Sequence, residues 1–151
     1  MPNKEFTISA IKDGTVIDHI NAKNTFKVAE LLKLGEHKDV VNVATNLPSN
    51  KMRIKGLIKI GVRELNKDEV NKVALLAPEA TVSIIKEFEV KDKFRVTVPD
   101  VVPNIIQCSN PKCITNMQPV SSRFNVMTAD PLKVRCDYCE RAMWGDEIKF
   151  K

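Results

Sequence analysis

Four cysteines in the C-terminal part of this 151-residue chain constrain its fold more than any other feature. Their order is Cys108-x4-Cys113, then twenty-two intervening residues, then Cys136-x2-Cys139. Each short loop can present two thiolates to one point, and the two loops together can surround an ion tetrahedrally. The spacing therefore predicts that one Zn²⁺ ion is bound by all four cysteines.

Two other uses of the cysteines compete with zinc. Two disulfides would need an oxidising compartment, and the N-terminus lacks the charged-then-apolar layout of a signal peptide. A redox-active Cys136-x-x-Cys139 pair would usually open a helix, whereas here the surrounding sequence is rich in strand-forming residues. A four-cysteine site leaves no open position for water or substrate, so we expect a structural metal that stabilises a small domain.

The first half of the chain alternates strand and helix patterns. Asp13-Gly14 between two apolar runs predicts a tight turn, and apolar residues at helical spacing, among them Ala22, Phe26, Ala29 and Leu32, predict a helix capped by Gly35. The expected elements are strands over 6–11 and 15–20, a helix over 21–34, and paired strands over 40–44 and 53–62 around a turn at 46–50.

A second helix is the clearest local prediction. Asn66 followed by Glu69 resembles a capping box, the residues Val70, Val73, Ala74 and Ala77 share one helical face, and Pro78 ends the run. Two further strands, over 80–90 and 93–98, follow around a turn at Lys91-Asp92. The expected order of strand, helix, strand, strand, helix, strand matches the split βαβ arrangement, with one additional edge strand.

The predicted fold class is α+β. A ferredoxin-like antiparallel sheet with two helices forms the N-terminal domain, residues 1–99, and a small all-β zinc-binding domain forms residues 100–151. Pro99 and Pro103 suit a semi-rigid linker at the boundary. The hydrophobic fraction of 43% can supply a core, and charged residues at 28% argue against a disordered chain.

Charge and hydropathy limit the partners. The net charge of +5 is spread over both halves of the chain, and aromatic residues make up only 5%, which leaves few platforms for base stacking. A zinc-ribbon module that binds nucleic acid is therefore the second hypothesis rather than the first. No apolar run is long enough to span a bilayer, so we expect a cytoplasmic protein without a membrane partner.

Parts of an active site are scarce. The chain has two histidines and no Gly-rich phosphate loop or nucleophile elbow, which disfavours a small-molecule enzyme. His37 is most simply a solvated side chain, whereas His19, next to Asp18, is equally compatible with a buried pair or a ligand contact. Alternation over 53–62 places Arg53, Lys55, Leu57 and Lys59 opposite the isoleucines, either as a solvated surface or as a site for a phosphorylated ligand.

The chain resembles the regulatory chains of aspartate carbamoyltransferase over nearly its whole length. The resemblance rests on several segments together with the cysteines: Gly14-Thr15-Val16-Ile17-Asp18-His19-Ile20, Asn46-Leu47-Pro48-Ser49, Leu57-Ile58-Lys59-Ile60, Ala77-Pro78 with Thr81-Val82, and Pro119-Val120-Ser121-Ser122. It implies a non-catalytic subunit whose N-terminal domain binds nucleotide effectors and whose zinc domain docks onto a separate catalytic chain.

The resemblance also implies particular residues for the nucleotide site. Those expected around the base and lining the site are Ile8, Ile11, Leu57, Ile85 and Val90, and those expected near the ribose and phosphates are Asp18, His19, Lys55, Lys59 and Lys93. Ser9, Ser83 and Phe88 stand where the family often has Glu, Asn and Tyr. The implied effectors are CTP and ATP, with UTP as a further candidate.

The implied assembly is large. Asn110, Lys112 and Glu140, on or beside the cysteine loops, are expected to face the catalytic chain, and the N-terminal domains are expected to form a homodimer. Three such regulatory dimers would bridge two catalytic trimers in a dodecamer. The function implied is allosteric control of pyrimidine biosynthesis.

Overall fold

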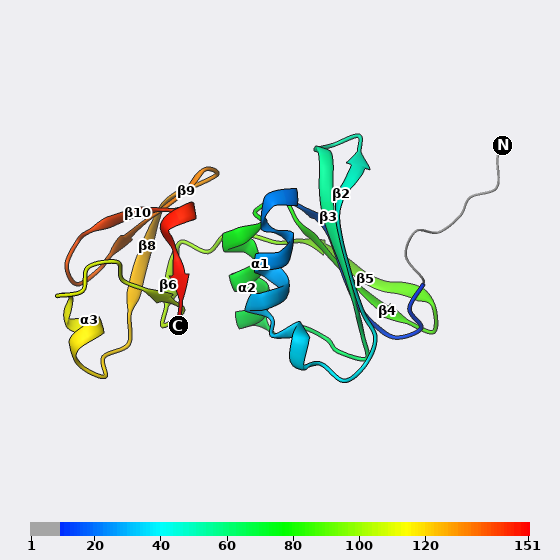
Figure 1. The fold of residues 1–151 in the computed structure, drawn as a ribbon, viewed down its shortest axis with the longest axis horizontal. Helices are drawn as coiled ribbons and strands as arrows, with labels where there is room; N and C mark the ends of the chain where they lie inside the picture. The colour runs from blue at the N-terminus through cyan, green and yellow to red at the C-terminus, as the bar shows by residue number, and fades with distance from the viewer. Residues whose placement is uncertain (1–9) are drawn as a thin grey trace.

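The computed structural model describes residues 10–151, which form two lobes along the longest axis of the molecule (Figure 1). The N-terminal lobe is a five-stranded antiparallel sheet whose helices α1 (Thr25–Leu31) and α2 (Lys67–Leu76) lie between the sheet and the second lobe. The C-terminal lobe is built mainly of short strands. The predicted fold class is confirmed.

The sheet has the strand order β2-β3-β1-β4-β5, so the first strand lies in the middle. The strands are β1 (Gly14–Ile20), β2 (Val41–Ser49), β3 (Arg53–Gly61), β4 (Thr81–Lys86) and β5 (Glu89–Arg95). Neighbouring strands are antiparallel throughout. One face carries the buried aliphatic residues beneath the helices, as the alternation over 53–62 predicts, since Ile58 and Ile60 are fully buried.

The predicted turn at Asp13-Gly14 leads directly into strand β1. Within the described residues, Ala10 and Ile11 have no strand conformation, and β1 begins at Gly14 itself and pairs with β3 and β4. Gly14 has a φ of 141°, and a Cβ at this position would collide with the carbonyl of Ile60. The rest of the predicted strand over 6–11 lies outside the described residues.

The first helical segment is shorter and more broken than its periodicity predicts. It consists of the 3-10 turn η1 (Ala22–Asn24), helix α1 and the 3-10 turn η2 (Leu34–Glu36). Gly35 is not the cap: Lys33 adopts the left-handed conformation that follows the end of α1, and Gly35 lies inside η2. Phe26 is also not part of the apolar face, because it is 65% exposed while Val28 and Leu32 are buried.

Helix α2 confirms the clearest local prediction. The side chain of Asn66 accepts a hydrogen bond from the backbone N–H of Glu69, and the Glu69 carboxylate accepts one from the backbone N–H of Asn66. Glu69 also pairs with Arg63, which in turn donates to the carbonyl of Leu32. The cap thus connects α2 to the end of α1.

Two predicted turns are misplaced. Strand β2 continues through a bulge near Asn46 to Ser49, so the chain reverses at residues 50–52 rather than 46–50. The β4–β5 hairpin turns at Glu87 and Phe88, both with positive φ, and Lys91-Asp92 lies within β5. Neither Glu87 nor Phe88 is a residue type that favours positive φ, which explains why the sequence pattern did not predict the turn at this position.

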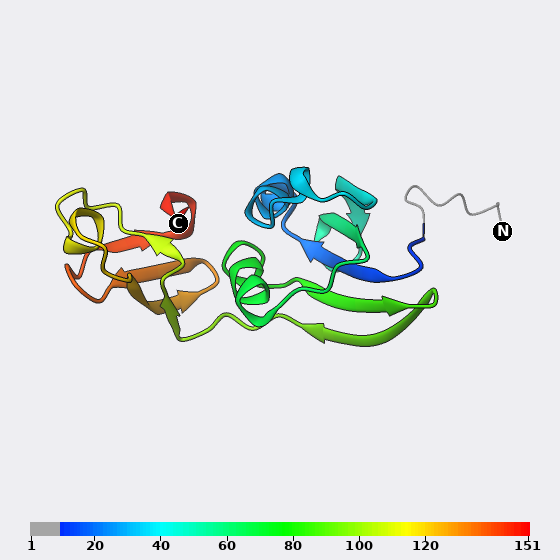
Figure 2. The ribbon, with the colours of Figure 1, turned by 90° about the horizontal axis from the view of Figure 1, so that it is seen from below.

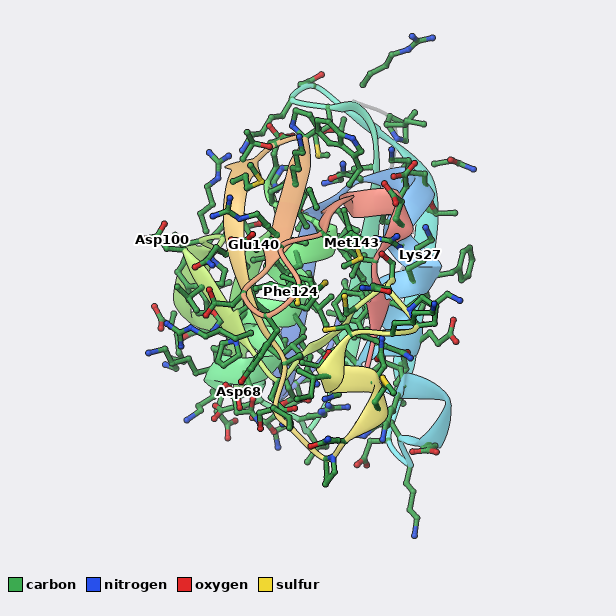
Figure 3. All side chains as sticks on the ribbon, turned by 90° about the vertical axis from the view of Figure 1, so that its left-hand side faces the viewer. Lys27, Asp68, Asp100, Phe124, Glu140 and Met143 are labelled. Atoms are coloured by element: carbon green, nitrogen blue, oxygen red, sulfur yellow. The ribbon has the colours of Figure 1, made fainter. Side chains whose placement is uncertain are left out.

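The C-terminal lobe holds a four-stranded sheet of order β10-β9-β8-β6 and a separate β11–β7 pair. Its elements are β6 (Val101–Pro103), β7 (Ile106–Gln107), α3 (Ile114–Met117), β8 (Arg123–Ala129), β9 (Leu132–Cys136), β10 (Ala142–Trp144), the 3-10 turn η3 (Gly145–Glu147) and β11 (Lys149–Phe150). Phe124 and Met143 are almost fully buried in its core (Figure 3).

Each lobe has its own hydrophobic core, and one helix contributes to both. Val73, Ala74 and Leu76 of α2 belong to the N-terminal core, whereas Leu75 of the same helix packs into the C-terminal core. Phe150 is partly buried against both cores. Figure 2 shows the chain between β5 and β6 passing beside α2 as it connects the two lobes.

Candidate functional sites: a metal centre and an open sheet face

The four cysteines lie at the turns that surround one end of the C-terminal sheet. Cys113 immediately precedes α3, and its backbone N–H donates to the carbonyl of Asn110, which closes the first loop. In the second loop, Glu140 has a φ of 63° and its N–H donates to the carbonyl of Cys136, so the chain turns back and brings Cys139 beside Cys136. These backbone hydrogen bonds close the two loops that carry the thiols.

The sulfur positions fit a tetrahedral metal site. All four Sγ atoms lie within 4.8 Å of one another, with Cys108 and Cys139 at 3.6 Å and Cys113 and Cys136 at 3.8 Å. A metal–sulfur bond of about 2.3 Å in a regular tetrahedron places neighbouring sulfurs about 3.8 Å apart. The thiols are free rather than paired as disulfides. They form a site for a structural metal ion.

Without a cation the four thiols constrain one another's protonation. Burial raises the pKa of the Cys108 thiol to about 12 and also raises the pKa of Cys136. At Cys139 burial acts in the same direction, but hydrogen bonds from the Arg141 backbone, Asn110 and the other thiols outweigh it and lower the pKa to about 7. A bound cation would favour four thiolates, so metal binding must release protons.

A buried hydroxyl supports the metal site from outside. Thr115 is buried and its Oγ1 lies 3.1 Å from the sulfur of Cys113. Hydrogen bonds to ligating thiolates orient them and reduce their charge. Sequence spacing alone did not reveal Thr115, although a hydroxyl two residues after a ligand on the first turn of a short helix is a signal that could have been used.

The residues expected to face a catalytic chain surround the metal loops. Lys112 and Glu140 are exposed, and Asn110 is half-buried with its Oδ1 accepting a hydrogen bond from the Lys112 backbone. The Asn110 carbonyl also accepts from the side chain of Asn116. The positions of these three residues therefore depend on the metal loops. The contact of these residues with a catalytic chain stays a prediction.

The second candidate site is the sheet face opposite the helices. The register places Lys59 of β3 opposite Val16 of β1, Val16 opposite Ser83 of β4, and Ser83 opposite Lys93 of β5. Residues directly opposite one another in antiparallel strands share a face. Two lysines thus stand at the ends of one row across four strands, joined by small residues.

A bulge in β1 brings Asp18 and His19 together on this face. Asp18 pairs with Lys55 at 2.7 Å, and the Asp18 carboxylate also accepts the His19 backbone N–H at 2.6 Å. Simple alternation would turn His19 toward the core, but its φ of 58° breaks the pleat. Its Nδ1 instead lies 3.1 Å from Thr81 Oγ1, a site residue that the sequence did not indicate.

The apolar residues implied for the nucleotide site are only partly assembled. Ile85 is buried and pairs with Val90, which is 58% exposed, and Leu57 is half-buried beside Lys55 and Lys59 on the same strand. Ile11 is buried just before β1. Ile8 lies outside the described residues, as does Ser9.

His37 differs from its prediction as a solvated side chain. It is half-buried, and its Nε2 donates to the carbonyl of Gly61 at 2.7 Å, so it fastens the chain before β2 to the end of β3. The role is structural, and it lies away from the residues of the open sheet face.

Two family models match the chain. The first, described as aspartate carbamoyltransferase regulatory chain, allosteric domain, matches residues 6–97, and the second, described as aspartate carbamoyltransferase regulatory chain, metal binding domain, matches residues 100–149. The chain belongs to the aspartate carbamoyltransferase regulatory chain family. The resemblance stated from the sequence is confirmed.

Individual regulatory chains are similar over almost their full length. That of Pyrococcus abyssi is 51% identical over 146 residues, which cover 95% of this chain and 96% of the relative. That of Parabacteroides distasonis is 41% identical over 148 residues, covering 98% and 96%. As a member of this regulatory chain family, the protein is a non-catalytic subunit with an allosteric and a metal-binding domain.

The family name places the chain in pyrimidine biosynthesis, the context in which aspartate carbamoyltransferase acts. Among residues 10–151, no helix is long and apolar enough to cross a membrane.

Proposed function

We propose that this regulatory chain binds nucleoside triphosphates on the open face of its N-terminal sheet and transmits their binding to an aspartate carbamoyltransferase catalytic chain. The observation that carries the proposal is the register that aligns Lys59 and Lys93 across the sheet, beside the Asp18–Lys55 pair. Three lysines and one carboxylate give this open surface a net positive charge, which suits a polyphosphate because its charge must be compensated when it leaves water.

Each residue of the sheet face has a role in this proposal. Lys55 and Lys93 contact phosphates, and Lys59, Asp18 and His19 act near the ribose and phosphates. The Asp18–Lys55 pair is half-buried, with side-chain exposures of 26% and 18%, so it orders both side chains before a ligand arrives. Ile8, Ile11 and Val90 surround the base, and Leu57 and Ile85 line the site. CTP and ATP are the expected effectors, and UTP is a third.

The metal in the proposal is a structural Zn²⁺ held by Cys108, Cys113, Cys136 and Cys139. Four sulfur ligands in a tetrahedral arrangement are typical of zinc, and the two 3.6–3.8 Å sulfur pairs agree with its bond length. The domain boundary falls between residues 99 and 100. The zinc domain, 100–151, presents Asn110, Lys112 and Glu140 to the catalytic chain.

The proposed assembly is the dodecamer of two catalytic trimers and three regulatory dimers, with dimerisation through the N-terminal domains in the cytoplasm. Neither a nucleic acid nor a membrane is a partner in it. Nucleotides can alter catalysis only if they bind two quaternary states with different affinities, since a ligand of equal affinity shifts nothing. The sheet face and the metal loops lie in different lobes, so the coupling runs through the whole chain.

The deciding experiment mixes the zinc-loaded chain with an aspartate carbamoyltransferase catalytic trimer and follows activity while CTP, ATP and UTP are titrated. We expect a complex of defined stoichiometry by light scattering and a change in the aspartate saturation curve on adding nucleotide. If the two chains fail to associate, or associate without any nucleotide response, the proposal is wrong.

Variants locate the nucleotide site. Lys59→Ala and Lys93→Ala should each weaken CTP binding about tenfold or more, because each removes a charge-assisted hydrogen bond, while zinc content stays unchanged. Lys91→Ala is the matched control: Lys91 lies on β5 with Lys93 but pairs with Glu89 at 3.3 Å outside the aligned row. Wild-type CTP affinity in the two test variants would contradict the assignment.

A further inference from the structure

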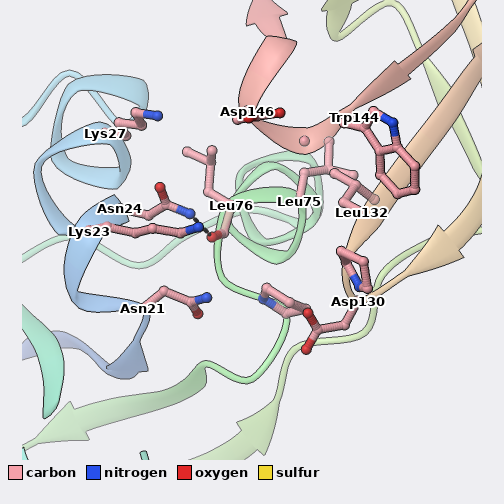
Figure 4. A pocket seen from close by; sticks show the side chains of 13 residues that line it. Asn21, Lys23, Asn24, Lys27, Leu75, Leu76, Asp130, Leu132, Trp144 and Asp146 are labelled. Atoms are coloured by element: carbon pink, nitrogen blue, oxygen red, sulfur yellow. Dashed lines mark hydrogen bonds between the residues drawn. The ribbon is translucent and has the colours of Figure 1, made fainter.

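A cavity of about 420 Å³ lies between the two lobes, away from the sheet face and from the metal loops. Figure 4 shows its two walls: residues of η1, α1 and the end of α2 on one side, and residues of the β8–β9 turn, β10 and η3 on the other. Cavities of this size at domain boundaries, with mixed apolar and polar lining, are common ligand sites. Neither the nucleotide proposal nor the metal site uses any of its residues.

The two walls carry opposite charges that are not neutralised within the structure. Lys23 and Lys27 line the N-terminal wall, and Asp130 and Asp146 line the C-terminal wall. Among residues 10–151, none of these four side chains takes part in a hydrogen bond or ion pair. The lining therefore offers two cations and two anions and has no net charge.

A buried acceptor at the cavity also lacks a partner. The Oδ1 atom of Asn21 is inaccessible to solvent and accepts no hydrogen bond from the described part of the chain. Asn21 precedes η1 but makes no capping hydrogen bond, and its side chain is directed toward the cavity in Figure 4. A buried acceptor without a donor costs free energy, so the surrounding contacts of this wall must hold Asn21 in place.

The walls are fixed before any ligand binds. Asn24 donates to the carbonyl of Leu76 at 2.7 Å, which ties α1 to the end of α2. On the opposite wall, Thr128 donates to the carbonyl of Pro131 at 2.6 Å, and the Trp144 N–H donates to Glu147 at 3.1 Å, which closes η3. Leu75, Leu76 and Leu132 supply the apolar part of the lining. A preorganised cavity reduces the entropy lost on binding.

We propose that this inter-lobe cavity binds a free amino acid with an aliphatic side chain. The carboxylate of such a zwitterion faces the N-terminal wall with Lys23 and Lys27, its ammonium group faces the C-terminal wall with Asp130 and Asp146, and its side chain contacts the leucines. A lining without net charge does not attract a polyphosphate, so the ligand preference of this site differs from that of the nucleotide site. A zwitterion matches both walls at once.

The test is isothermal titration of the zinc-loaded full chain with L-leucine, and then singly with each of the other proteinogenic amino acids, at low ionic strength and without nucleotide. We expect one site per chain, and about tenfold weaker binding in both Lys27→Met and Asp146→Asn. Lys38→Met and Asp100→Asn are exposed controls outside the cavity and should bind as the wild type does.

Two results would overturn the proposal. One is the absence of binding for every amino acid tested. The other is binding that Lys27→Met and Asp146→Asn leave unchanged, which would place the ligand elsewhere. If the lobes instead close directly through Lys–Asp pairs, small-angle scattering should show a salt-sensitive compaction without any amino acid binding. Because no catalytic chain is present, the outcome does not depend on the nucleotide proposal.

Discussion

The two lobes solve the problem of stability by different means. The N-terminal core consists of aliphatic residues from a sheet and two helices, and Ile17, Ile58, Ile60 and Val73 are completely buried. The C-terminal core is smaller: three of its eleven buried members are the metal-site residues Cys108, Cys113 and Cys136, and one, Leu75, belongs to the other lobe. Because thiols occupy core positions that aliphatic residues would otherwise fill, the stability of the C-terminal lobe depends on the metal ion that the thiols bind.

Removing the metal should have the largest effect and should be confined to one lobe. We expect Cys113→Ser, or treatment with a strong chelator, to unfold the C-terminal lobe and abolish docking, because a structural zinc site supplies on the order of 10 kcal/mol to its domain. Hydrogen exchange would show lost protection after residue 100 and retained protection in the sheet of β1–β5.

The control for the metal prediction is Ser109→Ala, an exposed change in the same loop that should leave zinc content intact. The metal should also be held less tightly as pH falls, because the raised pKa of Cys108 and Cys136 means that their protons compete with the ion. A Cys113→Ser chain that still docks normally would show that the lobe does not need its metal.

A cavity in the aliphatic core should have the next largest effect, and in the other lobe. Ile58→Ala should lower the free energy of unfolding of the N-terminal lobe by about 2–5 kcal/mol, because Ile58 is fully buried and the space left behind does not collapse. Ile54→Ala is a matched control on the same strand, since Ile54 is 46% exposed. Urea unfolding followed by circular dichroism should distinguish the Ile58→Ala and Ile54→Ala variants. An equal loss of unfolding free energy in both would contradict the burial of Ile58.

Loss of the α2 cap should have the smallest effect. Asn66→Ala removes the acceptor for the Glu69 N–H and should lower the unfolding free energy by about 1 kcal/mol. Asn66→Asp keeps an acceptor at the same place and should behave like the wild type. Thermal unfolding of both variants measures the difference, and an Asn66→Ala chain as stable as Asn66→Asp would show that the capping box contributes nothing.

Features with a strong local cause could be predicted from sequence. The α2 cap follows from Asn66 and Glu69 alone, the buried face of β3 follows from alternation, and the convergence of thiols follows from cysteine spacing. For the cap and the strand face, residues close together in sequence carry enough information, because one hydrogen bond pattern or one pleat determines the geometry. For the cysteines, the requirement of one metal for four ligands links two loops that lie far apart in sequence.

Features decided by distant contacts could not be predicted. The β4–β5 turn occurs at Glu87-Phe88, where the N–H of Phe88 donates to the carbonyl of Lys12, a partner that only the folded sheet provides. His19 takes a left-handed conformation and reaches Thr81, although alternation assigns it to the core side. Alternation over 53–62 indicated a basic sheet face that suits either solvent or a phosphorylated ligand, and the individual nucleotide roles came from family resemblance.

Helix α2 imposes an unusual constraint on how such a chain can vary. Successive residues in its last turn serve different lobes: Ala74 and Leu76 the N-terminal core, and Leu75 the C-terminal one. Each residue advances an α-helix by about 100°. Inserting or deleting a single residue within α2 ahead of Leu75 would therefore turn the Leu75 side chain away from the C-terminal core. An insertion in the turn at residues 50–52 would leave both cores intact, whereas an insertion within α2 ahead of Leu75 would disrupt the packing of one lobe against the other.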